Sequence, residues 1–279
     1  MDLIIERFSL LSERPDSELG LVTGAMTISR LYQPVVDEAG VLNRLDALGA
    51  TLRKRLGAGA SLADQVEALN RLLFVEEGFA GDRDDFEDPR NSFLDEVLER
   101  RRGIPISLSL VYVEVARRAG LTAWGIGFPG HFLAKVGQGG RSLVVDPYNA
   151  GAILSADDLD ARLAGLFGDD RLSVRAHPSL LRAATHREIL VRMLRNLKAV
   201  YLGRGQSGEA LRAVCAILAL APDLPEELRD RGLIYRDLGH HQAALADLRR
   251  FRELSDDGAE IAQVSAMIEE LAATPMRVH

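Results

Sequence analysis

The sequence of 279 residues contains a single cysteine, Cys215, so no disulfide can form within the chain. Long hydrophobic runs are also missing, and the apolar stretches that are present are too short to cross a lipid bilayer. No basic segment precedes the first apolar residues, as it would in a secretory signal peptide. These absences predict a protein of the cytoplasm.

Positive charge is scarce relative to negative charge. The chain has 34 lysine and arginine residues against 41 aspartate and glutamate residues, a formal net charge of −7, and a pI near 5.5. Proteins that hold nucleic acid or an anionic membrane through their overall charge carry the opposite sign. We therefore expect neither nucleic acid nor a membrane as a partner.

The first part of the chain is predicted to be helical. Apolar residues recur at helical spacing over residues 17–31, 37–56 and 61–76, and Ser61 stands at the third of these as a helix cap. With 47% hydrophobic residues, the chain is long enough to form two domains with separate cores. We place the boundary near Pro178, which gives domains of residues 1–178 and 179–279.

An acidic cluster between residues 82 and 88 raises the question of a calcium site. An EF-hand loop beginning at Asp82 would need glycine at its sixth position and glutamate at its twelfth, where this chain has Glu87 and Phe93. The histidines at 177, 186, 240, 241 and 279 show no metal-ligand spacing either. We predict a solvated loop and expect no metal or other cofactor.

A central helix is predicted over residues 105–120. Pro105 suits its first turn and Gly120 its C-terminal end. Ser107 lies in the first turn, where unpaired backbone N–H groups could stabilise an oxyanion, and its hydroxyl is the candidate nucleophile. Glu114 lies seven residues later on the same side; it is a candidate pocket residue, although a structural carboxylate is the commoner role.

Two apolar runs after this helix, residues 131–136 and 141–146, flank the glycine-rich loop 137–140 and predict a β-hairpin. Symmetric pairing about a four-residue loop places Val136 opposite Arg141 and His131 opposite Asp146. An aspartate beside a histidine orients the imidazole and stabilises its charged form, as in catalytic triads. Ser107, His131 and Asp146 are therefore the candidate catalytic residues, and a structural hydrogen bond of His131 is the alternative.

Two asparagines complete the candidate pocket. Asn91 stands where a helix through residue 101 is predicted to begin, so it either starts that helix or turns its amide toward Ser107. Asn149 follows Asp146 in a turn containing Pro147.

The last hundred residues repeat with a period of 34. At this offset Leu194 matches Leu228, Tyr201 matches Tyr235, Gly205 matches Gly239, Ala210 matches Ala244 and Leu211 matches Leu245. This is the tetratricopeptide period, typical of stacked helix pairs. We expect the array to bind a protein or peptide, and an intramolecular scaffold is the alternative. Two such units and an amphipathic final helix are few for an independent array, so we expect the array to dock on the first domain or to be completed by its leading helix.

Four segments carry a family resemblance: DPRNS (88–92), RGIPISLS (102–109), FPGHF (128–132) and DPYN (146–149). They resemble the bacterial transglutaminase-like family with a tetratricopeptide tail, the SirB-type proteins identified as regulators of SirC expression. The resemblance implies an α+β, papain- or transglutaminase-like core with a helical N-terminal part and a central helix packed on a small antiparallel sheet. An all-α repeat region would follow this core.

The sequence departs from the enzymes of that fold at one position. Their nucleophilic cysteine stands at the start of the central helix, where this chain has Pro105, Ile106, Ser107 and Ser109, and counting back from Gly120 leads nearest to Pro105. We therefore expect a non-catalytic regulatory or protein-binding protein. The alternative is a serine-dependent amide hydrolase or acyl transferase that uses Ser107, His131 and Asp146.

Overall fold

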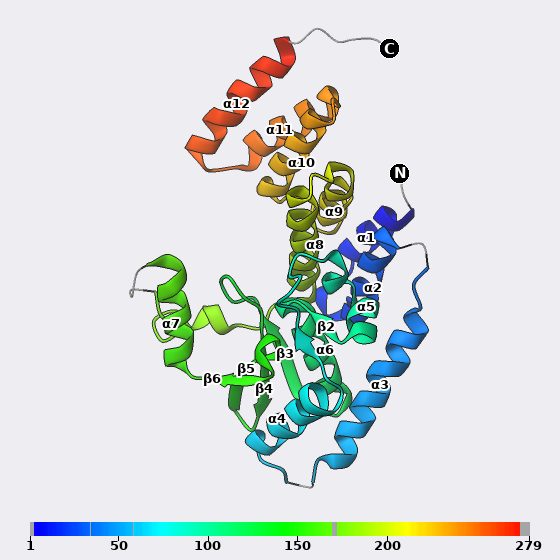
Figure 1. Cartoon of the computed structure of the whole chain (residues 1–279). Helices are drawn as coiled ribbons and strands as arrows, with labels where there is room; N and C mark the ends of the chain where they lie inside the picture. The colour runs from blue at the N-terminus through cyan, green and yellow to red at the C-terminus, as the bar shows by residue number, and fades with distance from the viewer. Residues whose placement is uncertain (1–2, 34, 58, 169–171, 274–279) are drawn as a thin grey trace. The chain divides into compact units, whose positions relative to one another are not determined.

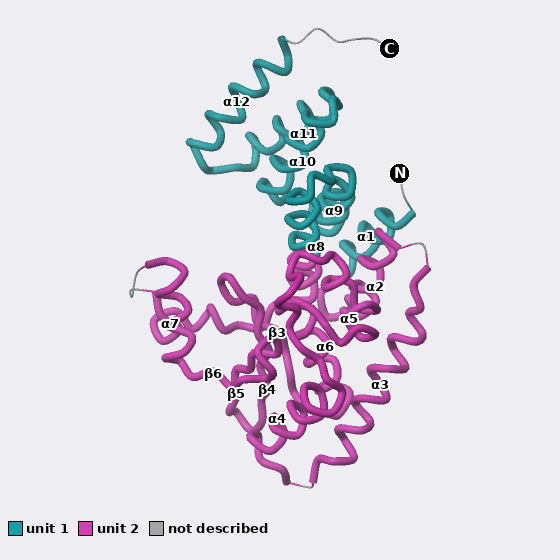
Figure 2. The backbone as a smooth tube through the Cα atoms, viewed as in Figure 1, with its two compact units in different colours: residues 1–15, 194–279 teal, residues 16–193 magenta. Residues whose placement is uncertain are grey.

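The computed structural model describes residues 3–33, 35–57, 59–168 and 172–273, which divide into two compact units (Figures 1 and 2). The core unit comprises residues 16–193, and the repeat unit comprises residues 1–15 and 194–279. The division falls within helix α8 (His186–Gly203), because the start of α8 belongs to the core unit. There Asp16 accepts hydrogen bonds from the backbone N–H groups of His186 and Arg187, each at 2.9 Å. The domain boundary near Pro178 stays a prediction.

The predicted helices of the first part are present in the core unit. They are α2 (Leu21–Tyr32), preceded by a 3-10 turn η1 (Asp16–Glu18), then α3 (Glu38–Arg55) and α4 (Leu62–Asn70). Asp37 caps α3, and Ser61 forms a capping box with Asp64 at α4. The third predicted helix continues beyond Asn70 as a π-helix, η2 (Arg71–Glu76).

Several short elements precede the central helix. Among them, the helix predicted from Asn91 through residue 101 is present but begins later, at Leu94, and Asn91 lies in the 3-10 turn before it. Strands β1 (Ala80–Gly81) and β2 (Arg102–Gly103) form a parallel pair, with η3 (Pro89–Ser92) and α5 (Leu94–Arg100) between them. The central helix α6 (Pro105–Arg118) begins directly after β2, at the predicted proline. It is buried along most of its length, as its apolar composition predicts.

An antiparallel sheet of four strands packs against α6. Its strands are β3 (Thr122–Ile126), β4 (Leu133–Gln138), β5 (Arg141–Asp146) and β6 (Ala152–Leu154), in the order β3-β4-β5-β6. The 3-10 turn η4 (Pro147–Asn149) joins β5 to β6, and a second, η5 (Pro178–Leu181), precedes α8. Helix α7 (Ala156–Phe167) contributes Leu159 and Leu163 to a cluster with Leu133 and Val144 of the sheet. The α+β class and the transglutaminase-like architecture are confirmed.

The repeat unit is helical, and no strand occurs in the part of it that the structure describes. After α8 come α9 (Ser207–Leu220), α10 (Pro225–Asp237), α11 (His241–Leu254) and α12 (Gly258–Ala273). Gly205 and Gly239, 34 residues apart, both adopt left-handed φ values, of 69° and 78°, in the equivalent turns. The predicted repeat is confirmed. No helix within the described residues is both long and apolar enough to span a membrane.

Helix α1 (Leu3–Ser12), which the sequence did not predict, belongs to the repeat unit. It packs against α9, and Phe8 is its one fully buried side chain. The N-terminal end of the chain therefore adds an apolar layer to an array that has only two repeats. The sequence predicted that docking on the first domain or the leading helix would complete the array, and it did not indicate this contribution from α1.

An ion-pair ladder also follows the 34-residue period. Arg195 NH2 lies 3.2 Å from Glu226 Oε2, and at the equivalent positions Arg229 pairs with Glu260. Lys198 joins the ladder by contacting both the buried Glu227, at 2.8 Å, and Asp230, at 2.6 Å. The periodic charges connect α8, α10 and α12, and comparing charges at the 34-residue offset would have found them.

One buried ion pair breaks the repeat. Arg231 and Asp247 occupy the positions of Leu197 and Ala213 in the first repeat, and the guanidinium contacts both carboxylate oxygens, at 2.7 and 2.8 Å. We expect Asp247→Ala to lower the free energy of unfolding of the repeat unit by about 2 kcal/mol, because Arg231 is left unpaired. The double variant Arg231→Leu, Asp247→Ala, which copies the first repeat, should regain most of that loss in urea unfolding followed by circular dichroism. A double variant as unstable as the sum of the single ones would contradict this.

Candidate functional site

The hairpin that carries the site has a different register from the one predicted. Gln138, not Val136, pairs with Arg141, and Val136 pairs with Leu143. The turn consists only of Gly139 and Gly140, whose φ values of 56° and 79° are those of a tight turn that matches the strand twist. The predicted four-residue loop is therefore wrong, because two glycines suffice to reverse the chain.

The contact between His131 and Asp146 is nevertheless present. His131 Nε2 lies 2.9 Å from Asp146 Oδ1. The register differs from the predicted one by two residues, and an even shift leaves every side chain on its original face of the sheet. His131 lies just before β4 instead of within it, and its side chain is about one-sixth exposed.

Asp146 is fully buried and accepts hydrogen bonds from three residues. Besides His131, these are Arg162 of α7, whose NH2 lies 2.7 Å from Oδ2, and Asn149, whose Nδ2 also lies 2.7 Å from Oδ2. Burial alone would raise the pKa of the Asp146 carboxyl. The hydrogen bonds and charges of these partners outweigh burial and hold the pKa well below its usual range. Asp146 is therefore ionised at neutral pH.

Aromatic side chains extend the site beyond the predicted residues. The ring of Tyr148 meets that of His131 edge to face, with centroids 6.1 Å apart, and that of Phe86 in the same way at 6.2 Å. Arg83 lies over the Tyr148 ring at 5.6 Å, and its NH2 contacts Asn149 Oδ1 at 2.5 Å. Tyr148 stands within the segment that carried the family resemblance, which is the signal that could have singled it out.

Ser107 does not join this group in the structure. Its side chain is fully buried, and its hydroxyl donates to the backbone oxygen of Asn91 at 2.6 Å. Ser107 Oγ also accepts a hydrogen bond from the Ile104 N–H at 3.1 Å, as part of the cap of α6. Within the described residues, no hydrogen bond connects Ser107 with His131. Its observed contacts are those of a structural serine.

Of the other candidate pocket residues, Asn149 contacts Asp146, whereas Asn91 and Glu114 form hydrogen bonds or ion pairs elsewhere in the core unit. Asn91 is fully buried; its amide donates to Asp85 O at 2.8 Å and its Oδ1 accepts from Arg100 NH1 at 3.2 Å. It thus meets Ser107 through its main chain and not through its amide. Asn149 does bind Asp146. Glu114 pairs with Arg118, which also binds Asp46 of α3 at 2.7 Å, so this carboxylate connects α6 with α3.

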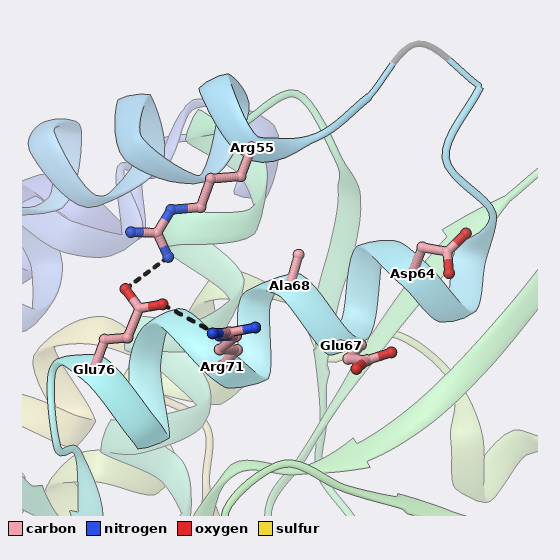
Figure 3. Close-up of a pocket in the computed structure, with 6 residues that line it drawn as sticks. All are labelled: Arg55, Asp64, Glu67, Ala68, Arg71 and Glu76. Carbon is pink, nitrogen blue, oxygen red and sulfur yellow. Dashed lines mark ion pairs between the residues drawn. The ribbon is translucent and has the colours of Figure 1, made fainter.

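A surface pocket of about 420 Å³ lies elsewhere in the core unit, between the end of α3 and the α4–η2 segment (Figure 3). Glu76 pairs there with Arg55 at 2.7 Å and with Arg71, five residues earlier, at 3.6 Å. A π-helix repeats its hydrogen bonds at five residues, so this pair follows the spacing of η2. The lining is charged, unlike the mostly apolar lining of small-molecule sites. In the part of the chain that the structure describes, no group of His, Cys, Asp or Glu side chains is arranged to hold a metal.

Comparison with known proteins identifies a family for each part of the chain. The family model of the transglutaminase-like superfamily matches residues 39–195, and a tetratricopeptide-repeat model matches residues 197–269. The chain belongs to the transglutaminase-like superfamily. A UPF0162 protein of Xylella fastidiosa (strain Temecula1) is 37% identical over 277 residues, covering 99% of both chains. Protein SirB1 of Salmonella typhimurium is 28% identical over 247 residues, covering 86% of this chain and 88% of its own.

The family match and the similarity to SirB1 confirm the resemblance that the four sequence segments indicated. In enzymes of this fold the nucleophile stands at the start of the central helix, which is α6 in this chain. Ser109 Oγ donates to Phe132 O at 3.3 Å, and Pro105 lies one turn earlier on the same helix face. Tyr148 lies against Gly81, whose strand partner Gly103 is two residues before Pro105. The start of this transglutaminase-like helix is thus connected to the segment before β4 through Ser109 and to Tyr148 through the β1–β2 pair.

Proposed function

We propose that this protein is a non-catalytic binding and regulatory protein of the cytoplasm. In this proposal the core unit keeps the transglutaminase-like fold without a nucleophile, and the repeat unit holds a protein or peptide partner. The observation that carries the proposal is the Ser107 hydroxyl, which is fully buried and donated to the main chain of Asn91. A serine needs an adjacent base to become a nucleophile, and this hydroxyl has a carbonyl partner instead.

A second support is the chemistry of Pro105, the residue nearest to the position that the family resemblance gives to the nucleophile. Proline has neither a thiol nor a hydroxyl, so Pro105 can supply no covalent intermediate. The His131–Asp146 pair then has no nucleophile in this chain to activate. Its remaining roles are those of a buried, ordered hydrogen-bonding group at the edge of a binding surface.

The repeat unit supports the partner-binding half of the proposal. Tetratricopeptide repeats generally mediate contacts between proteins. The ladder of Arg195, Glu226, Arg229 and Glu260 joins the helices of successive repeats, so these helices are already connected before any partner arrives. A preformed surface loses less conformational entropy on binding than a flexible one.

The test is chemical labelling of the nucleophile position. We expect a fluorophosphonate probe to leave Ser107 of the wild-type chain unmodified, as read by mass spectrometry of the peptide containing it. In a Cys215→Ala background, Pro105→Cys should introduce a thiol that iodoacetamide alkylates rapidly at pH 7, because His131 favours the thiolate. Adding His131→Ala should slow that alkylation by about tenfold.

Each arm of the labelling experiment has an opposing result. Labelling of wild-type Ser107 that disappears in His131→Ala would establish the serine hydrolase or acyl transferase and refute the non-catalytic proposal. An alkylation rate of Pro105→Cys that is independent of His131 would show that Pro105 does not occupy the nucleophile position. The variant keeps the helix start intact, since Pro105 contributes no backbone hydrogen bond at this first position.

A further inference from the structure

Phe86 is an exposed aromatic side chain in the middle of the acidic loop 82–88. Its exposed fraction is 51%, whereas Asp82 and Asp88 on either side are buried. These two carboxylates are neutralised: Arg100 lies 3.4 Å from each, and Arg90 lies 2.7 Å from Asp88. Asp84 and Glu87 are exposed and form no ion pair among the described residues. Phe86 thus presents an aromatic ring among exposed carboxylates, and aromatic side chains are enriched at protein interfaces.

The rings next to Phe86 form a preorganised row. Phe86 meets Tyr148, which meets His131, with centroid separations of 6.2 and 6.1 Å. The Tyr148 hydroxyl donates to Asp82 O at 2.9 Å, and its ring lies so close to Gly81 that a Cβ there would collide with it. A fixed aromatic ring loses little side-chain entropy when a partner covers it, which is why such rings dominate binding surfaces.

The charges around this row select the partner. Arg83 holds its guanidinium over the Tyr148 ring, 5.6 Å from the centroid, so that ring face is already covered within the chain and Phe86 is the ring left open to a partner. The carboxylates of Asp84 and Glu87 add negative charge at the rim, next to the exposed ring of Phe86. A segment bearing arginine side chains can stack on the exposed Phe86 ring and pair with these carboxylates, whereas an acidic segment is repelled.

We propose that Phe86, Tyr148 and His131, with Asp84 and Glu87 at the rim, form a docking surface for a basic, arginine-bearing polypeptide segment. This proposal rests on the non-catalytic binding function of the core unit. It gives that unit a partner chemistry of its own. The exposed phenylalanine supplies apolar contact area, and the rim supplies the preference for positive charge.

The test uses the full chain and a defined probe, the acetylated and amidated heptapeptide Arg-Gly-Arg-Gly-Arg-Gly-Arg. In titrations followed by heteronuclear NMR, we expect the wild-type chain to bind this peptide and not its glutamate counterpart. Phe86→Ala should weaken binding about fivefold. The double variant Asp84→Asn, Glu87→Gln should weaken binding and reduce its dependence on salt. Leu10→Ala, which removes a side chain of similar exposure, 56%, in the repeat unit, should leave the affinity unchanged.

Three results would overturn the docking surface: no binding at millimolar peptide, equal affinity of wild type and Phe86→Ala, or equal affinity for the glutamate peptide. None of them depends on the labelling of Ser107. If the peptide fails to bind while Ser107 stays unlabelled, the non-catalytic function stands and this surface is rejected. If Ser107 is labelled, the function itself is rejected, whatever the peptide does.

Discussion

Phe8→Ala is expected to lower the free energy of unfolding of the repeat unit by about 3–5 kcal/mol, the usual cost of truncating a fully buried phenylalanine. Phe8 has no exposed surface and lies on α1, which packs against α9. Its removal leaves a cavity against α9 in an array that has only two repeats. The substitution therefore tests whether the N-terminal helix is a working part of the repeat unit.

The measurement must separate the two units. Amide hydrogen exchange in peptides from α9 reports on the repeat unit, and the fluorescence of Trp124, the single tryptophan, reports on the core unit. We expect faster exchange in α9 without a matching change in the Trp124 transition. Leu10→Ala on the same helix, where the side chain is 56% exposed, is the control and should change stability by no more than about 0.5 kcal/mol. Equal effects of the two substitutions would mean that α1 does not pack on α9 in solution.

Asp146→Asn is expected to destabilise the core unit by about 2–4 kcal/mol. The neutral amide loses the charge-assisted hydrogen bonds from His131 and Arg162, and its own N–H group faces donors instead of acceptors. The cost stays below that of a fully buried broken pair, because Arg162 keeps about a third of its side-chain surface in contact with water. Urea unfolding followed by Trp124 fluorescence measures the effect.

Asp157→Asn provides the matched control. Asp157 pairs with Arg175 at 2.8 Å, but both side chains are largely exposed, so the loss of this pair should be close to neutral. A destabilisation by Asp146→Asn no larger than that of Asp157→Asn would contradict the account of the buried carboxylate.

The same carboxyl predicts the pH dependence of the difference between wild type and Asp146→Asn. Because the folded-state pKa of Asp146 lies below its unfolded value, the carboxylate contributes its full stability above the unfolded pKa, near 4. That contribution falls as the pH drops from there toward the lower pKa of the folded state. The stability difference should therefore be constant above about pH 5 and shrink below pH 4. A stability difference that grows on acidification would contradict this prediction, because it would require a folded-state pKa above the unfolded one.

The elements predicted most accurately depend on patterns within a short stretch of sequence. Ser61 caps the helix that its side chain indicated, α6 begins at Pro105, and equivalent glycines close the two repeat turns. The hairpin was predicted in the right place with the wrong register, because the conformation of two adjacent glycines decides the turn length. The contact of His131 with Asp146 survived this error only because the shift was even.

What the sequence by itself determined is therefore most of the helices, the two hairpin strands, the 34-residue repeat and the family, since periodicity, caps and motifs are local properties of the chain. Only the tertiary structure decided which groups meet. Ser107 turns to Asn91, Arg162 reaches Asp146 from α7, and Arg83 reaches Asn149 across 66 residues of sequence. The helix α1 joins α9 from the opposite end of the chain. Such contacts depend on how apolar faces pack together, and packing brings together residues whose local patterns carry no information about each other.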